Sequence, residues 1–298
     1  FFFFSCIKMR YPVLVQISGY DQHMTKMAEI LKFQEIASKA IDDSSTELNN
    51  LSREIWNHPE QNFQEKFAHN FLTKFLKDKG FTVTTDIGEM KTAFRAVYND
   101  GVKGPRVGIC CEYDALPEIN HACGHNLIAE AGIAAALGIK AAIEASNNTL
   151  GSLVVFGTPA EEGGGGKILM IDEGCFDDVD FCLMAHPTAF DSATPLILGC
   201  KDVLIKYHGH AAHAAAFPWE GVNALDAAIA CYSSLSMLRQ QMKPTWRVHG
   251  VFKDGGVKPN IIPETSALRY YFRAPNNDDL RILLEKAKGC WEGAASAT

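Results

Sequence analysis

Positive charge is scarce in this sequence. Its 298 residues carry 28 Lys and Arg against 35 Asp and Glu, a formal net charge of −7. A chain of that balance lacks the attraction to phosphate on which nucleic-acid and membrane-surface binders depend. No apolar run approaches the roughly 18 residues that a transmembrane helix needs. The 24 Gly and 12 Pro are also too few for a disordered or collagen-like chain.

Cysteine is present, but without the pattern of a secreted disulfide scaffold. The nine cysteines are an odd number, and several lie inside apolar runs, where a thiol behaves as a small buried hydrophobe. The paired cysteine motifs of structural zinc sites are missing as well. Free thiols fit a reducing compartment, so we expect a cytoplasmic protein, with the nucleus as a further location.

The first residues give little information about the fold. The segment Phe1–Lys8 is apolar but short, and no basic segment precedes it, so it makes a poor secretion signal. We therefore expect residues 1–25 to be a leader or the edge of a fragment, outside the fold.

Strands and helices alternate over residues 26–200. Short apolar runs typical of buried strands are found at residues 106–111, 151–156 and 180–184. An Ala- and Leu-rich helix is expected at residues 126–146. This alternation predicts an α/β domain whose mostly parallel sheet is flanked by helices.

The pattern changes in residues 201–298. Apolar and polar residues alternate at 202–207, 245–252 and 265–272, as in strands with one face in water. A long helix is expected at residues 223–242, and another toward the end of the chain. This order predicts a separate, smaller α+β domain.

The segment His121-Ala-Cys-Gly-His125 is the sharpest chemical feature. Cys123 and His125 are two residues apart, and a thiolate and an imidazole are good zinc ligands. Gly124 lets the backbone turn, so both side chains can face one point. The N-terminus of the following helix favours the thiolate. On spacing alone, a structural thiol beside two surface histidines explains the segment equally well.

Two adjacent carboxylates, Glu161 and Glu162, directly follow an apolar strand. On an extended backbone, neighbouring side chains point to opposite sides, so one can bind a metal while the other faces a bound water. The glycines at residues 163–166 keep the space around them open. Taken alone, the pair is better explained as a solvated acidic turn.

Asp114 and His186 lie near the ends of two other predicted strands. In an open α/β sheet, groups at strand ends collect at one edge. Each alone is more often structural than functional. Together with Cys123, His125 and the two glutamates, however, they favour a metal site.

Residues 201–298 offer a second, weaker set. His213 follows a predicted strand, and Asn260 and Arg273 lie thirteen residues apart. The Arg273 guanidinium can bind a carboxylate with two parallel hydrogen bonds. By composition alone, all three are better explained as surface residues.

Five motifs occur in order: Asp114-Ala-Leu-Pro117, His121-Ala-Cys-Gly-His125, Pro159-Ala-Glu-Glu-Gly163, Ala185-His-Pro187 and His213-Ala-Ala-Ala-Phe-Pro218. With them, the chain resembles the zinc-dependent aminoacylase and carboxypeptidase family of two-metal amidohydrolases over residues 28–298. The segment Lys258-Pro-Asn-Ile-Ile-Pro263 is similar to a dipeptidase branch of that family. Several ordered motifs carry more weight than any single one.

The resemblance implies a metal centre. Cys123 would bridge two Zn2+ ions, with Mn2+ or Co2+ as alternatives. The terminal ligands would be His125, Glu162 and His186. Asp114 would orient these ligands without binding the metal itself.

The resemblance also assigns roles in the reaction. Glu161 would be the general base that takes a proton from a metal-bound water. His213 of one subunit would stabilise the oxyanion in the active site of its partner. Asn260 and Arg273 would bind the terminal carboxylate of the substrate.

Architecture and substrate follow from the same resemblance. Residues 26–200 would form the metal-binding catalytic domain, and residues 201–298 a ferredoxin-like lid through which a homodimer forms. The expected substrates are dipeptides with a basic C-terminal residue, such as β-alanyl-lysine or Xaa-Arg, Xaa-Lys and Xaa-ornithine. The family has one more metal-binding histidine and further strands beyond this point, so we expect a chain truncated at its C-terminus.

Three other functions remain open. An N-acyl-amino-acid amidohydrolase of the aminoacylase or hippuricase type would use the same metal site. A non-catalytic truncated protein would bind a peptide or partner through residues 201–298. An enzyme with Cys123 as its nucleophile is the third, and it would leave the glutamate pair without a role.

Overall fold

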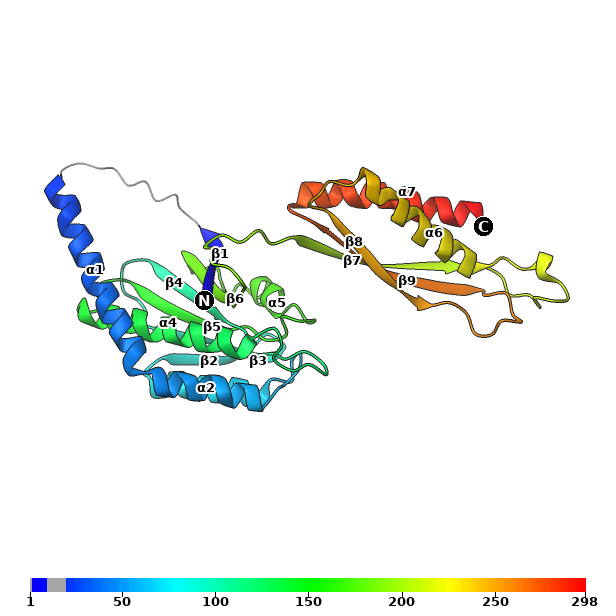
Figure 1. Cartoon of the computed structure of the whole chain (residues 1–298). Helices are drawn as coiled ribbons and strands as arrows, with labels where there is room; N and C mark the ends of the chain where they lie inside the picture. Colours follow the sequence, from blue (N-terminus) through cyan, green and yellow to red (C-terminus); the bar gives the residue numbers. More distant parts are fainter. Residues whose placement is uncertain (1, 10–19) are drawn as a thin grey trace. The chain divides into compact units, whose positions relative to one another are not determined.

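The computed structural model describes the backbone of residues 2–9 and 20–298, and side chains from residue 28 onward. Two units, each built on its own sheet, divide after Pro195 (Figure 1). The boundary expected from the sequence lay at residue 200.

The first unit has one sheet, whose described strands lie in the order β1-β6-β4-β5-β3-β2. Their bounds are β1 (Phe2–Met9), β2 (Thr82–Ile87), β3 (Met90–Tyr98), β4 (Arg106–Cys111), β5 (Ser152–Gly157) and β6 (Phe181–Pro187). The described helices are α1 (Tyr20–Asp43), α2 (Ser45–Asn57), α3 (Lys66–Asp78), α4 (His125–Ala145) and α5 (Gly166–Asp172).

The α/β class expected from the sequence is confirmed, although the sheet is less parallel than expected. Strand β4 pairs in parallel with β5 and β6, whereas the β1–β6, β2–β3 and β3–β5 pairs of the described strands are antiparallel. The two-residue turn Gly88-Glu89 joins β2 to β3, and so short a connection allows only an antiparallel pair. Gly88 has a φ of +55°, which suits a residue without a Cβ.

Residues 2–9 do not lie outside the fold, in contrast to our expectation. They form β1, which pairs antiparallel with β6 from Phe2 opposite Pro187 to Met9 opposite Phe181. This pairing supplies hydrogen-bond partners to an edge that would otherwise expose its amides and carbonyls. Residues 20–25 begin helix α1. The rest of the expected leader, residue 1 and residues 10–19, is outside the described residues.

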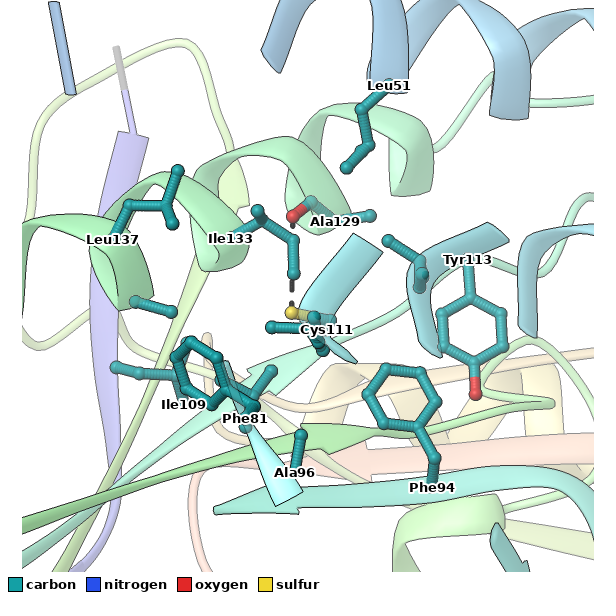
Figure 2. Close-up of a cluster of buried hydrophobic side chains, with 14 of the residues drawn as sticks. Leu51, Phe81, Phe94, Ala96, Ile109, Cys111, Tyr113, Ala129, Ile133 and Leu137 are labelled. Atoms are coloured by element: carbon teal, nitrogen blue, oxygen red, sulfur yellow. Dashed lines mark hydrogen bonds between the residues drawn. The ribbon is translucent and has the colours of Figure 1, made fainter. Parts of the chain in front are cut away.

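The main core of the first unit lies between its sheet and helices α2, α3 and α4 (Figure 2). Leu51 of α2, Ile133 of α4 and Ile109 of β4 belong to one cluster and are at most 1% exposed. The Phe94 ring stacks on Tyr113 with 6.1 Å between centroids. Burying each such side chain stabilises the fold by roughly 1.5–3 kcal/mol. The strand ends beside this core are therefore rigid supports for polar groups.

Helix α4 is long and apolar enough to cross a membrane, but half of that stretch is buried inside the unit. It packs against α1, α2 and the central strands. A Cβ at Gly132 would lie 2.4 Å from the Cys111 sulfur, so glycine permits this close approach to β4. The Cys111 thiol donates to the carbonyl of Ala129 (Figure 2). The apolar composition of α4 is therefore explained by its position as a core helix.

The second unit is a three-stranded antiparallel sheet in the order β7-β9-β8. Its described elements are β7 (Gly199–His208), α6 (Ala224–Leu238), β8 (Arg247–Asp254), β9 (Thr265–Ala274), α7 (Asn277–Ala297) and the single-turn 3₁₀ helices η1 (Pro218–Glu220) and η2 (Arg239–Gln241). Leu268, Tyr270 and Phe272 of β9 alternate into a core shared with α6 and α7. This order confirms the smaller α+β unit expected from the sequence.

Candidate functional site

Polar side chains collect where three neighbouring parallel strands end. Glu112 and Asp114 follow β4, and Glu161 and Glu162 follow β5. His186 lies at the end of β6. Because the carboxyl ends of parallel strands meet at one edge of the sheet, these residues gather at the place where an open α/β fold builds its sites.

Cys123 and His125 reach the same edge from the turn that starts α4. They form one cluster with Glu112, Asp114, Glu161, Glu162 and His186. Gly124 has a φ of +83°, and this left-handed residue lets the chain turn directly into the helix. Cys123 Sγ lies 3.6 Å from Nε2 of His186, on the neighbouring strand. The nearby His125 and His186 rings lower the pKa of the Cys123 thiol, which favours the thiolate.

The fully buried His125 ring has one nitrogen engaged and one free. Nδ1 lies 3.0 Å from Oδ1 of Asp114, so the ring donates its Nδ1 proton to that carboxylate. Nε2 faces Glu112 Oε2 at 3.4 Å and Glu162 Oε1 at 3.7 Å. Asp114 therefore fixes the ring so that its second nitrogen points into the cluster.

The negative charges of the cluster exceed the positive charges that its own residues provide. Burial by itself lowers the pKa of His125, but the hydrogen bond to Asp114, the nearby Cys123 and the charge of Glu112 outweigh it and raise the pKa to about 11. The hydrogen bond to Cys123 likewise raises the pKa of His186. A site that holds protons this firmly is one in which a cation is stabilised.

The donor atoms fit a metal ion. Within the described part of the chain, Glu112 Oε2, His125 Nε2 and Glu162 Oε1 are buried and have no hydrogen-bond partner. The possible ligand atoms of Cys123, His125 and Glu162 all lie within 4.8 Å of one another. Two ligands of one tetrahedral Zn2+ lie about 3.4 Å apart for a nitrogen–oxygen pair and about 3.6 Å for sulfur–nitrogen. The observed distances are close to these values.

The two adjacent glutamates have different surroundings. The side chain of Glu161 is 43% exposed and that of Glu162 is 20% exposed. Burial, then the nearby charge of Glu112, raises the pKa of Glu161. An accessible carboxyl with a raised pKa is suited to proton transfer, whereas Glu162 is suited to coordination.

Two buried carboxylates hold the backbone of this segment. Ala160 has a φ of +55°, which is uncommon for a residue with a Cβ. Its amide donates to Glu65 at 2.9 Å, and the amide of Glu162 donates to Asp114 at 3.0 Å. These contacts compensate the strained turn and fix the direction in which Glu161 points.

Three residues of this region, Glu112, Lys167 and Glu65, were not predicted from the sequence. Glu112 is 1% exposed and forms an ion pair with Lys167 of α5. Its signal was its spacing of two from Asp114, which places both on one side of an extended segment. Glu65 had no local signal, because its partners lie far along the chain.

His121 is not part of the cluster, since its Nε2 donates to the carbonyl of Ile55 at 3.1 Å.

His213 and Asn260 lie on adjacent segments of the second unit. The Ala214 amide donates to the Asn260 carbonyl at 3.1 Å. Nδ1 of the exposed His213 accepts from the amides of Ala215 and Ala216, both at 3.2 Å. Because Nδ1 is an acceptor, Nε2 of the neutral ring carries the proton and is a free donor.

The structure does not bring Asn260 and Arg273 together within one chain. Arg273 pairs with Cys200 at one end of the sheet, and Thr265 pairs with His208 at the other. Asn260 belongs to the loop that leads into Thr265. Eight residues of strand span about 26 Å, so these side chains cannot share one carboxylate unless different subunits supply them. The strand expected at residues 265–272 lies between them and holds them apart.

Residues 198–295 match the sequence model of a peptidase dimerisation domain of the M20 family. The chain is 50% identical over 281 residues to the Xaa-Arg dipeptidase of Mus musculus and 47% identical over 283 residues to that of Homo sapiens. Each alignment covers 91% of this chain, which spans 65% and 64% of those proteins. One of the subunits of the Escherichia coli p-aminobenzoyl-glutamate hydrolase is 33% identical over 91% of this chain and 59% of its own length.

Solved structures share the fold. One, described as an aminohydrolase from methicillin-resistant Staphylococcus aureus, superposes with a TM-score of 0.72 at 21% identity, covering 89% of this chain and 72% of its own. The dinuclear metal-binding M20 peptidase YXEP of Bacillus subtilis has a TM-score of 0.58 at 19% identity, covering 85% and 70%. Residues 198–295 therefore match an M20 dimerisation domain, and the sequence similarity to the two Xaa-Arg dipeptidases runs through both units.

Proposed function

We propose that this chain carries the active site of a metal-dependent dipeptidase whose substrates end in a basic residue. The observation that carries the proposal is the convergence of unpartnered, buried ligand atoms beside Cys123 and His125. The similarity to two Xaa-Arg dipeptidases supports this substrate class, with β-alanyl-lysine, Xaa-Lys and Xaa-ornithine as related candidates.

The proposed metal is zinc, with two ions per site and Mn2+ or Co2+ as alternatives. Cys123, His125, Glu162 and His186 would hold it, and a thiolate with imidazoles and a carboxylate is a donor set that zinc prefers. Such an ion acidifies a water molecule and polarises the scissile carbonyl. The family resemblance further implies a bridging role for Cys123.

Glu161 is proposed as the proton carrier of the reaction. It accepts a proton from the attacking water as the water oxygen bonds to the amide carbon. It then delivers that proton to the amide nitrogen as the carbon–nitrogen bond breaks, which releases an amine and a carboxylic acid that become an ammonium and a carboxylate at neutral pH. Its exposure and raised pKa support both steps.

His213 is proposed to stabilise the oxyanion that forms between these steps. Its Nδ1 accepts two backbone amides, so its Nε2–H is available to a negatively charged oxygen. We propose that it acts in the active site of a partner, in a homodimer formed through the region that matches a dimerisation domain. Asn260 would bind the substrate carboxylate, and Arg273 could take part only from another subunit.

The cytoplasm is proposed as the location, with the nucleus as a second one. Eight cysteines of the described residues are free, and several are buried. Free thiols persist where the environment is reducing.

A second candidate, an N-acyl-amino-acid amidohydrolase, is favoured by the similarity to one component of a p-aminobenzoyl-glutamate hydrolase. Both candidates use the same water chemistry and differ in the group on either side of the amide. Hydrolysis rates of β-alanyl-lysine, an Xaa-Arg dipeptide, acetyl amino acids and benzoyl amino acids should be compared on zinc-loaded protein. Faster cleavage of the basic dipeptides supports the dipeptidase, and faster cleavage of acyl amino acids supports the alternative.

Metal analysis distinguishes both from a non-catalytic protein. The zinc-loaded chain should retain zinc through dialysis at neutral pH, and a chelator should abolish hydrolysis. Failure to retain zinc, cobalt or manganese would favour a non-catalytic binding protein. Activity that survives chelation but is lost on thiol alkylation would favour Cys123 as a nucleophile.

A further inference from the structure

Glu112 is a buried carboxylate to which the reaction outlined above gives no task. Its side chain is 1% exposed, yet it lies among the ligand atoms of the cluster. Removing a carboxylate from water this completely is costly unless both of its oxygens find partners. The position of each oxygen therefore indicates what Glu112 does.

One oxygen has a partner and the other does not. Oε1 accepts from the ammonium group of Lys167, which reaches it from the first turn of α5. Oε2 has no hydrogen-bond partner among the described residues. It points toward His125, with 3.4 Å between Oε2 and Nε2.

The His125 ring leaves only one way to satisfy Oε2. Nδ1 carries a proton that is donated to Asp114. When the Nε2 lone pair binds a metal ion, Nε2 has no proton to give to Glu112. The remaining partner for Oε2 is then the ion itself, and 3.4 Å is the separation of two ligands at about 2.1 Å from one tetrahedral ion.

We propose that Glu112 is a further ligand of the metal ion that binds His125, and that Lys167 fixes its carboxylate in the coordinating orientation. The inference rests on the proposed metal-dependent function. It adds a carboxylate to a site for which the sequence predicted only Glu162. Lys167 acts as a positioning residue, because it contacts the ligand and not the metal.

Glu161 fits this ligand position less well. Its Oε2 lies 3.9 Å from Nε2 of His125, and its side chain is 43% exposed. An exposed carboxyl can rotate toward water and substrate, whereas Glu112 is confined by packing and by Lys167. Burial thus assigns coordination to Glu112 and proton transfer to Glu161.

The test measures metal binding directly in the 298-residue chain. Zn2+ affinity is obtained by competition with a chromophoric chelator, and the cobalt-substituted protein is examined by visible absorption, which reports coordination. Glu112→Gln keeps the shape and removes the charge, and Glu112→Asp keeps the charge but withdraws the oxygen. Glu60→Gln is the matched control, because Glu60 accepts two backbone amides at the start of α3 and lies outside the cluster.

Both Glu112 variants should bind Zn2+ at least about tenfold more weakly and show an altered cobalt spectrum. Lys167→Met should weaken binding less, and Glu60→Gln should match the wild type. Wild-type affinity and an unchanged cobalt spectrum in a folded Glu112 variant would overturn the inference. If Glu112→Gln does not fold, Glu112→Asp decides, because it retains the pair with Lys167. A wild-type chain that binds no metal would instead reject the proposed function.

Discussion

The two units present their candidate residues in opposite ways. In the first, possible ligand atoms come from three strand ends and one helix start, and three of them are buried without a hydrogen-bond partner among the described residues. In the second, His213 and Asn260 are exposed and lie on loops that backbone hydrogen bonds hold together. The first unit has the features of a preorganised metal centre, whereas the second presents its candidate residues to solvent.

The two units also differ in the free-energy cost of burying charged side chains. Packing of the core in the first unit compensates the cost of burying charges such as Glu112 and His125. The second unit bears no such cost, so its polar residues can change with little effect on stability. Substitutions in the two units should therefore fail in different ways.

The largest effect is expected at Glu161. Replacing it with Gln removes the proton carrier and should lower kcat by about two to four orders of magnitude while leaving zinc content unchanged. Glu162→Gln is the matched control at the next position and should lower zinc content itself. Zinc content by elemental analysis and kcat on a basic dipeptide separate the two. A Glu161→Gln variant with wild-type kcat would remove it as the base.

A smaller loss is expected at His213 in the second unit. His213→Ala should lower kcat by about two to three orders of magnitude, with metal affinity and melting temperature unchanged, because the side chain is exposed. His210→Ala, in the same exposed segment, should keep the wild-type rate. Equal rates for His213→Ala and His210→Ala would show that the second unit offers no donor to the reaction.

Asp114 tests the support behind the metal centre. Asp114→Asn removes the charge that accepts the His125 Nδ1 proton and should weaken zinc binding by about 10- to 100-fold. Competition with a chelator measures the change. Unaltered affinity would mean that packing alone orients the imidazole.

The smallest effect concerns pH and the buried Glu65. Burial raises the pKa of Glu65 above its ordinary value of 4.5. A group with a raised pKa in the folded state stabilises the fold at low pH, and this contribution is lost as pH rises through that pKa. The unfolding free energy of the wild type, relative to Glu65→Gln, should therefore fall between pH 4.5 and 7.5. Urea titrations at both pH values measure this, and a difference that rises with pH would contradict it.

The sequence was sufficient for the parts of this site that local patterns determine. Apolar runs located β4, β5 and β6. Polar residues at the ends of these strands predicted a common edge for Asp114, Glu161 and His186. Cys123 and His125 could be paired because only one glycine separates them. Such features depend on strand direction and on a single turn, both of which are visible in neighbouring residues.

Features that depend on distant contacts could not be predicted. The coordinating orientation of Glu112 requires Lys167, which is 55 positions away in the chain. The separation of Asn260 from Arg273, by contrast, follows from the strand already expected between them. The pairing of β1 with β6 joins the two ends of the first unit, and no local periodicity reveals such a register.

The central claim is that Cys123, His125, Glu162 and His186 surround a common metal ion. Zinc-edge X-ray absorption on the zinc-loaded 298-residue chain tests it most directly. The account predicts a sulfur neighbour at about 2.3 Å together with nitrogen and oxygen neighbours at about 2.0–2.2 Å, and loss of the sulfur shell in Cys123→Ser. A wild-type spectrum with only nitrogen and oxygen neighbours would contradict it.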